Sequence, residues 1–299
     1  MKLLSTKVLI ILAFFAIYII WGSTYLWNKI AVTALPAFFL AFFRFLCASI
    51  LIFLIAKVSG KKLGITKKQL KNSIFVAFLF MVSGNGLFVW ALKYVDSGFA
   101  ALLASTQPLF VLLLMRLIDN KKMQLKSIIG VVFGILGMYL LVSQHELVTD
   151  DDTLLGILLI FTCVIGWSYA SVFVSKADLP KNHLVSTGYQ MIIASVMLAI
   201  VSFSLGEQWT SPLTWNYDVQ WSMFLLIVFG SLVAFTAFNY LLKEVSTEKV
   251  ATSSYVNPVV ALLLGWWILD EELTTQSLIA ASILLVGVYF ITTRKKQNS

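Results

Sequence analysis

The sequence predicts an all-α membrane protein with ten transmembrane helices, built as two inverted five-helix repeats with both termini in the cytoplasm. Three observations lead to this fold class. Hydrophobic residues make up 60% of the 299 residues and charged residues only 12%, whereas soluble domains carry about one quarter charged residues. The charges separate long uncharged runs, and the second half of the chain repeats the first. These features exclude a water-soluble core.

Ten apolar runs meet the requirement of about 20 residues for crossing a hydrocarbon core. Their hydropathy is continuous rather than alternating, which favours helices over a closed barrel. The first run ends in aromatic residues without the small-residue cleavage pattern of a signal peptide, so we interpret it as a true span. The predicted spans are residues 8–27, 36–56, 72–92, 97–115, 127–143, 153–175, 184–205, 219–242, 250–269 and 273–293.

The repeat is clearest where residues 92–142 align with residues 242–292 without a gap, at an offset of 150. Pro108 meets Pro258 in this alignment. Earlier in the chain the match continues at an offset of 146, where Trp21 meets Trp167 and Arg44 meets Gln190. The chain is therefore an internal duplication of one apolar unit.

Five spans in each copy make the second copy enter the membrane from the opposite side, so the two halves are inverted. We expect the first repeat over residues 1–146 and the second over residues 147–299. Inverted halves normally hold the substrate at their interface near the midplane, and transport follows as one half rocks against the other.

Basic residues give the orientation, because basic loops stay in the cytoplasm. With both termini inside, 19 of the 22 Lys and Arg residues fall on the cytoplasmic side, and only Lys29 and Lys93 fall outside. The net charge of +8 then faces anionic lipid head groups and needs no nucleic acid. Cys47 and Cys163 lie inside spans, where a thiol is usually an apolar filler.

Two prolines occupy matching positions in the fourth and ninth spans. Pro108 and Pro258 each remove a backbone donor, so we expect a kink in both helices. A side-chain amide precedes each proline, Gln107 in one copy and Asn257 in the other. Each amide could bond a freed carbonyl or contact the substrate, and the sequence leaves both roles open.

Arg44 is the only charge within a predicted span. It lies roughly 12 Å into the bilayer, at 1.5 Å for each of the eight residues after Pro36. A charge at this depth usually faces a watery cavity and marks a functional site, although an arginine bonded to backbone carbonyls is the alternative. Without an intramembrane carboxylate to pair with, this guanidinium suits an anionic group on a substrate.

No span contains Asp or Glu, and His145 and His183 fall in loops. Their absence disfavours a proton relay within the membrane. It also removes a Ser-His catalytic pair and a His or carboxylate metal site. We therefore expect a protein that is not an enzyme and that carries no cofactor or metal.

Polar and aromatic residues at comparable depths in several spans predict a solvated central cavity. Asn85 stands between Gly84 and Gly86, a weak point in a helix. For each residue taken singly, bonding between helices is the alternative role. The predicted substrate-binding residues are Arg44, Trp21, Thr24, Asn28, Asn85, Trp90, Gln107, Trp167, Tyr169, Gln190, Asn239, Tyr255 and Asn257.

These features together resemble the EamA branch of the drug/metabolite transporter superfamily. The segment Trp21 to Tyr25, the Arg44-Phe45 step, the paired prolines and the acidic run Asp270 to Glu272 carry the resemblance. It implies a bacterial inner-membrane permease, often an exporter of amino acids, metabolites or drug-like compounds. Family members commonly place an acidic residue after both the fourth and the ninth helix. Here Glu271 keeps that position, and its counterpart in the first copy is Lys121.

We expect a secondary transporter or facilitator that exports a small metabolite, similar to an amino acid or organic acid, by alternating access. Its expected partners are the substrate and membrane lipids, and it is expected to act as a monomer or homodimer. Efflux of toxic compounds is the nearest alternative, but sites for cationic drugs usually hold a buried carboxylate. An intramembrane lipid-modifying enzyme is an alternative of another class, and it would need a nucleophile, base or metal ligand set.

Overall fold

The computed structural model describes residues 5–95, 97–120, 124–143, 151–269 and 273–292, and every regular element in these ranges is a helix. Six helical runs are long and apolar enough to cross a membrane. They are Thr6–Val32, Ala37–Val58, Lys67–Ala91, Thr153–Lys176, His183–Ser204 and Tyr217–Glu244. Shorter or interrupted helices cover the other four predicted spans.

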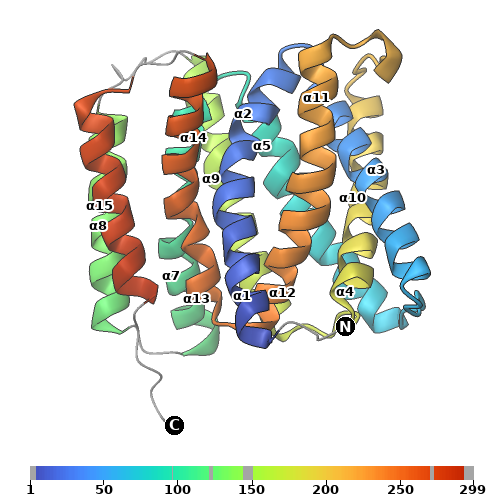
Figure 1. Cartoon of the computed structure of the whole chain (residues 1–299), viewed down its shortest axis with the longest axis horizontal. Coiled ribbons are helices and arrows are strands. Elements are labelled where there is room, and N and C mark those ends of the chain that lie inside the picture. Colours follow the sequence, from blue (N-terminus) through green and yellow to red (C-terminus); the bar gives the residue numbers. More distant parts are fainter. Residues whose placement is uncertain (1–4, 96, 121–123, 144–150, 270–272, 293–299) are drawn as a thin grey trace.

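The helices of the first half follow the predicted order (Figure 1). They are α1 (Thr6–Phe15), η1 (Ala16–Ile20), α2 (Trp21–Val32), α3 (Ala37–Val58), α4 (Lys67–Ala77), η2 (Phe78–Gly86), α5 (Leu87–Ala91), α6 (Ser97–Ala104), α7 (Gln107–Asp119) and α8 (Leu125–Val142).

The second half repeats this plan after residue 150. Its elements are α9 (Asp151–Lys176), α10 (His183–Ser204), η3 (Pro212–Thr214), α11 (Tyr217–Leu225), η4 (Leu226–Phe235), α12 (Thr236–Glu244), α13 (Thr247–Ala251), α14 (Ser253–Leu269) and α15 (Thr275–Thr292). The elements η1, η2 and η4 are π-helices, and η3 is a short 3₁₀ turn.

Both proline-containing spans are interrupted, but at different distances from the proline. Residues 105 and 106 separate α6 from α7, and Pro108 lies in the first turn of α7, where its missing N–H is not needed. In the ninth span the interruption is at Thr252, and Pro258 lies inside the continuous helix α14. The two interruptions therefore lie at different distances before the proline, although the prolines themselves align in the repeat.

Helices from the two halves pack against each other in matched pairs. The α3 helix packs along α10 at one edge of the bundle, and α8 packs along α15 at the other (Figure 1). Between these edges, α14 contacts α2 and α7 contacts α9. A two-fold relation between the repeats would exchange the two helices within each edge pair, and it would exchange the α14–α2 contact with the α7–α9 contact. Because these contacts all cross between the repeats, the halves share one interior.

The α8–α15 pair is closely packed because small residues let the backbones approach. A Cβ on Gly130 would lie 2.7 Å from the carbonyl oxygen of Gly287, and one on Gly134 would overlap the hydroxyl oxygen of Tyr255. Small residues at such spacing are typical of helix contacts in membranes. Gly134 thus leaves a notch that the Tyr255 ring of α14 fills.

The connection between α10 and α11 fixes the start of α3, the helix that carries Arg44. The Glu207 carboxylate accepts hydrogen bonds from the backbone N–H of Phe38 (3.2 Å) and Phe39 (2.7 Å). A carboxylate at a helix N-terminus is stabilising because it satisfies free donors and faces the positive end of the helix dipole. Trp209 stacks on Phe42 of the same helix with 4.8 Å between ring centroids.

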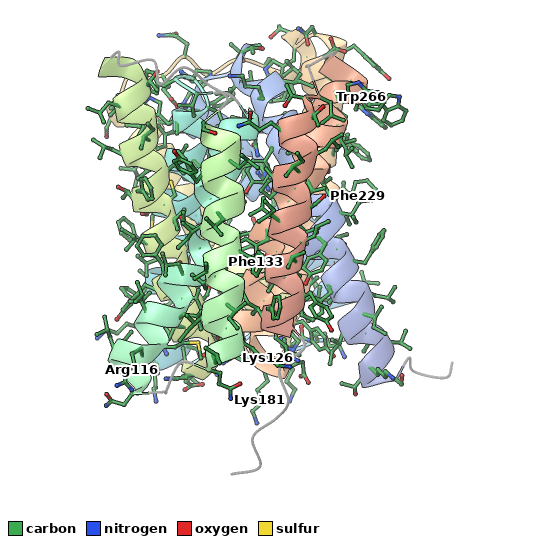
Figure 2. All side chains as sticks on the ribbon, turned by 90° about the vertical axis from the view of Figure 1, so that its left-hand side faces the viewer. Arg116, Lys126, Phe133, Lys181, Phe229 and Trp266 are labelled. Carbon is green, nitrogen blue, oxygen red and sulfur yellow. The ribbon has the colours of Figure 1, made fainter. Side chains whose placement is uncertain are left out.

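Basic side chains gather at one end of the bundle, which we call the basic end. Figure 2 shows Arg116, Lys126 and Lys181 at this end and Trp266 near the opposite one. Helix α1 begins and α15 ends at the basic end (Figure 1). Lys121 and Glu271, the pair at which the two copies differ in charge, lie outside the described residues.

Candidate functional site

A cavity of about 110 Å³ lies among helices of both repeats. Helices α2, α3, α5, α6, α7, α9 and α14 and the π-helices η2 and η4 line it. Eight of the thirteen predicted binding residues are in its wall: Trp21, Thr24, Asn28, Arg44, Asn85, Gln107, Trp167 and Asn257. The sequence therefore identified most of the polar lining of one cavity.

Arg44 is the charged residue of this cavity. Its side chain is 3% exposed, and its Nε donates to Ser231 Oγ at 2.7 Å. Its Nη1 lies 3.5 Å from Asn28 Oδ1, which accepts a long hydrogen bond. Neutral groups thus hold the guanidinium, and no Asp or Glu is among the described residues that line the cavity. The site is a fixed positive charge with donor capacity left over.

Two helices begin at the cavity wall. Gln107 is the first residue of α7, and Ser253 and Ser254 begin α14. The Ser254 hydroxyl donates to Gln107 Oε1, which links the two helix starts. Helix N-termini carry partial positive charge, and discontinuous helices of transporters commonly direct them at anionic substrate groups. The two helix starts therefore add to the positive potential of Arg44.

Backbone carbonyls of the π-helical segments accept hydrogen bonds from side chains that line the cavity. With its amide nitrogen turned toward η1, Asn257 donates to the carbonyls of Ile17 (3.0 Å) and Tyr18 (3.1 Å). Trp21 Nε1 donates to the carbonyl of Gly230 in η4 at 3.0 Å. π-Helical turns leave the regular hydrogen-bond pattern and are frequent at functional sites. Asn257 thus links α14 to the first span by hydrogen bonds.

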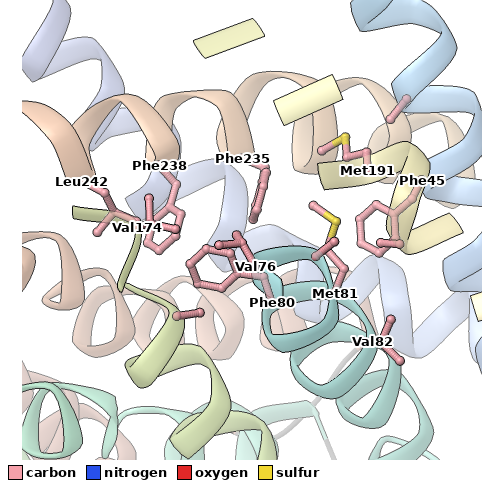
Figure 3. Packing of buried hydrophobic residues seen from close by; sticks show 14 of the residues in the cluster. Phe45, Val76, Phe80, Met81, Val82, Val174, Met191, Phe235, Phe238 and Leu242 are labelled. Atoms are coloured by element: carbon pink, nitrogen blue, oxygen red, sulfur yellow. The ribbon is translucent and has the colours of Figure 1, made fainter. Parts of the chain in front are cut away.

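Aromatic rings close the cavity on the side of the basic end. The ring of Trp21 lies 5.7 Å from that of Trp167 and 4.8 Å from that of Phe238, and Phe80 lies 4.8 Å from Trp167. Phe80, Phe235 and Phe238 gather in the buried cluster shown in Figure 3. The cluster continues into α4 and α12, which lie at the basic end (Figure 1). An apolar layer therefore separates the cavity from that end.

The structure places the other five predicted residues away from this cavity. Trp90 packs against Phe38, and the exposed Tyr169 contacts Phe75. Tyr255 is buried against Gly134.

Gln190 and Asn239 belong to a separate polar cluster, in which Asn239 Nδ2 donates to Gln190 Oε1 and to Thr187 Oγ1, both at 3.0 Å. The prediction grouped these residues because they occupy similar depths in their spans. Depth does not show which face of a helix points into the cavity.

Several lining residues escaped the prediction because they are apolar or small. They are Tyr25, Phe45, Met81, Gly84, Phe88, Ala104, Cys163, Val164, Gly230, Ser231, Phe235, Ser253 and Ser254. Ser231 had a signal in the sequence, since it is the one hydroxyl residue between positions 223 and 235 of the eighth predicted span. The apolar members have no such signal, because lipid-facing residues of the same types surround them.

A model of the EamA-like transporter family matches the chain twice, over residues 8–143 and 154–293. The chain belongs to the EamA-like transporter family. The two matched ranges agree with the duplication found in the sequence. The resemblance predicted from the motifs is confirmed.

Relatives of this EamA-like transporter cover nearly its whole length. "Uncharacterized inner membrane transporter YedA" of Escherichia coli (strain K12) is 34% identical over 95% of this chain and 90% of its own length. "Uncharacterized transporter YoaV" of Bacillus subtilis (strain 168) is 26% identical over 95% of this chain and 96% of its own. These names indicate a transporter rather than an enzyme, and the first agrees with the predicted inner-membrane location.

A solved crystal structure shares the fold of this EamA-like transporter. It has a TM-score of 0.77 and 18% identity, and the match covers 96% of this chain and 97% of the other. At this identity the likeness concerns the fold alone. The protein is thus a helical, multi-pass membrane transporter of the EamA type, with a small-molecule substrate and a lipid environment implied by its family.

Proposed function

We propose that this transporter moves a small metabolite with a carboxylate group, similar to an amino acid or organic acid, out of the cell across the cytoplasmic membrane. The observation that carries the proposal is the buried guanidinium of Arg44, held in the central cavity by the neutral partners Ser231 and Asn28. A buried cation without a carboxylate partner is costly, and an anionic ligand would offset that cost.

Two further features support an anionic substrate. The starts of α7 and α14 meet at the cavity and add partial positive charge. The aromatic rings of Trp21, Trp167 and Phe235 supply apolar surface in the wall of the same cavity. An amphipathic acid, with a charged head and an apolar body, satisfies both surfaces.

The proposed transport cycle uses the two repeats, each of five membrane-spanning helices, as inverted halves around this cavity. Matched packing of α3 with α10 and of α8 with α15 supports an exchange of equivalent contacts as the halves rock. The basic end is proposed as the cytoplasmic side, with both termini there. One chain provides the whole cavity wall, so a monomer would be sufficient for transport.

Efflux of cationic drugs is the second candidate within the transporter class. It is less well supported, because no acidic side chain is among the described residues that line the cavity. Catalysis on a lipid is supported less still, since those lining residues offer no acid, histidine or metal ligand set.

Counterflow in proteoliposomes tests the proposal. Vesicles preloaded with an unlabelled amino acid or organic acid should accumulate the radiolabelled acid, and Arg44→Met should abolish this exchange. Accumulation of a cationic dye without any exchange of acids would instead establish the drug-efflux alternative. Depletion of the acid from cells that overproduce the protein, compared with cells that produce Arg44→Met, would report outward transport.

A further inference from the structure

Asn85 places a side-chain carbonyl in the central cavity that no donor of the described protein satisfies. The oxygen Oδ1 is buried and has no hydrogen-bond partner, and the residue is in the cavity wall. Buried polar atoms nearly always have a partner, so an exception calls for an explanation such as a ligand or water.

The local sequence holds Asn85 in this position. It lies within the π-helix η2 between two glycines. A Cβ on Gly84 would lie 2.7 Å from the Trp167 ring, and one on Gly86 would lie 2.9 Å from Leu198 Cδ2. The two glycines therefore let this segment lie directly against α9 and α10. The side chain between them is fixed by that contact at the edge of the cavity.

Several other polar groups of the cavity bond protein partners. Asn28 donates to the carbonyl of Thr24 and accepts from Arg44, and Ser253 donates to the carbonyl of Val250. Ser254 and Gln107 bond each other, as described above. Among the described lining residues, Asn85 is the one with a buried acceptor left open.

The π-helix of the second repeat, η4, also lines the cavity, through Gly230, Ser231 and Phe235. The Ser231 hydroxyl in that segment accepts a hydrogen bond from Arg44 Nε, whereas Asn85 Oδ1 in η2 has no partner. The two π-helices therefore give the cavity one occupied acceptor and one open acceptor.

The geometry points to Asn85 as a specificity-determining residue that accepts a hydrogen bond from the substrate. The inference rests on the proposed function, in which Arg44 binds the carboxylate. The preferred substrates are then carboxylates that also carry a hydrogen-bond donor, an ammonium or a hydroxyl group, near the carboxylate. Plain carboxylates satisfy Arg44 and leave the carbonyl of Asn85 open, so they bind more weakly.

Three acids with one carbon skeleton test this inference: 3-methylbutanoate, 2-hydroxy-3-methylbutanoate and valine. Isothermal titration calorimetry on the purified full-length protein should show tighter binding of at least one donor-bearing acid, by about tenfold over 3-methylbutanoate. A preference for valine identifies an ammonium donor and a preference for the hydroxy acid identifies a hydroxyl donor, and either supports the inference.

Asn85→Leu should remove the preference while 3-methylbutanoate still binds with wild-type affinity, which also shows that the variant is folded. Asn85→Ala, which also removes the acceptor, serves if the leucine variant does not fold. Ser222→Ala is the matched control, because its buried hydroxyl also lacks a partner but lies outside the cavity; it should leave the preference unchanged.

Equal affinity of the wild type for all three acids would overturn the role of Asn85 and leave carboxylate binding intact. A preference that persists in Asn85→Leu would overturn it as well. If the wild type binds none of the acids, the proposed carboxylate transport fails and the inference fails with it.

Discussion

Replacement of Arg44 by methionine distinguishes between a substrate-binding role and a structural role for this arginine. Methionine is unbranched, reaches about as far as the Nε of arginine and keeps the apolar part of the side chain. The change removes the charge and two hydrogen bonds, to Ser231 Oγ at 2.7 Å and to Asn28 Oδ1 at 3.5 Å. Both former partners line the cavity, so water can solvate them in the variant.

The expected loss of affinity follows from a charged hydrogen bond. Such bonds contribute about 1.5–3 kcal/mol, and every 1.4 kcal/mol is about tenfold in a dissociation constant. Arg44→Met should therefore weaken binding of a carboxylate by about tenfold to a hundredfold. A neutral ligand that contacts the aromatic wall should bind within about threefold of wild type, a change of under roughly 0.7 kcal/mol.

The free energy of unfolding of Arg44→Met should not fall together with its affinity for carboxylates. The lost bond to Ser231 costs about 1.5–3 kcal/mol, as a hydrogen bond of a charged group, and the longer bond to Asn28 costs less. Removal of a charge that is 3% exposed and lacks an acidic partner offsets this, because burial of an ion carries an effective penalty of several kcal/mol. We expect the free energy of unfolding to remain equal or to increase, as is common when a residue that serves function rather than stability is replaced.

Calorimetric titration with a carboxylate measures the affinity, and thermal unfolding of the ligand-free protein in detergent measures stability. Ser231→Ala is the control, because it removes one bond to the guanidinium and leaves the charge in place. The reasoning is refuted if Arg44→Met binds the carboxylate with wild-type affinity. A variant that loses more than about 3 kcal/mol of stability, the upper end for one charged hydrogen bond, would assign Arg44 a structural role.

Three further predictions concern the framework around the site. Glu207→Ala should lower stability by about 1–2 kcal/mol, because the start of α3 loses its acceptor, whereas Glu207→Gln should lose less; denaturant unfolding measures both. Gly134→Ala should cost about 1–3 kcal/mol through overlap with Tyr255, and Tyr255→Leu in the same chain should recover part of it. Full additivity would contradict that contact. Reporter fusions should place the C-terminus in the cytoplasm and a tag at residues 208–212 outside; the reverse would contradict the proposed orientation.

Much of the fold was predictable because lipid imposes a simple rule on sequence. Every membrane-spanning segment must satisfy its backbone internally, so length and hydropathy define helices with little dependence on their neighbours. The predicted span 184–205 is helix α10 at His183–Ser204, and the span 36–56 is α3 at Ala37–Val58. The π-helices and the interruption at Thr252 were not predicted, because they depend on contacts between helices.

The sequence by itself determined the class of the protein, its duplication and the presence of an arginine deep within a membrane span. These follow from hydropathy, periodicity and the cost of a charge in hydrocarbon. Only the tertiary structure decided which polar residues share a cavity. Gln190, the counterpart of Arg44, bonds Asn239 in a separate cluster, whereas Ser231 reaches Arg44. In a membrane both the lipid-facing and the buried faces of a helix are apolar, so hydropathy cannot tell them apart, and packing makes that choice.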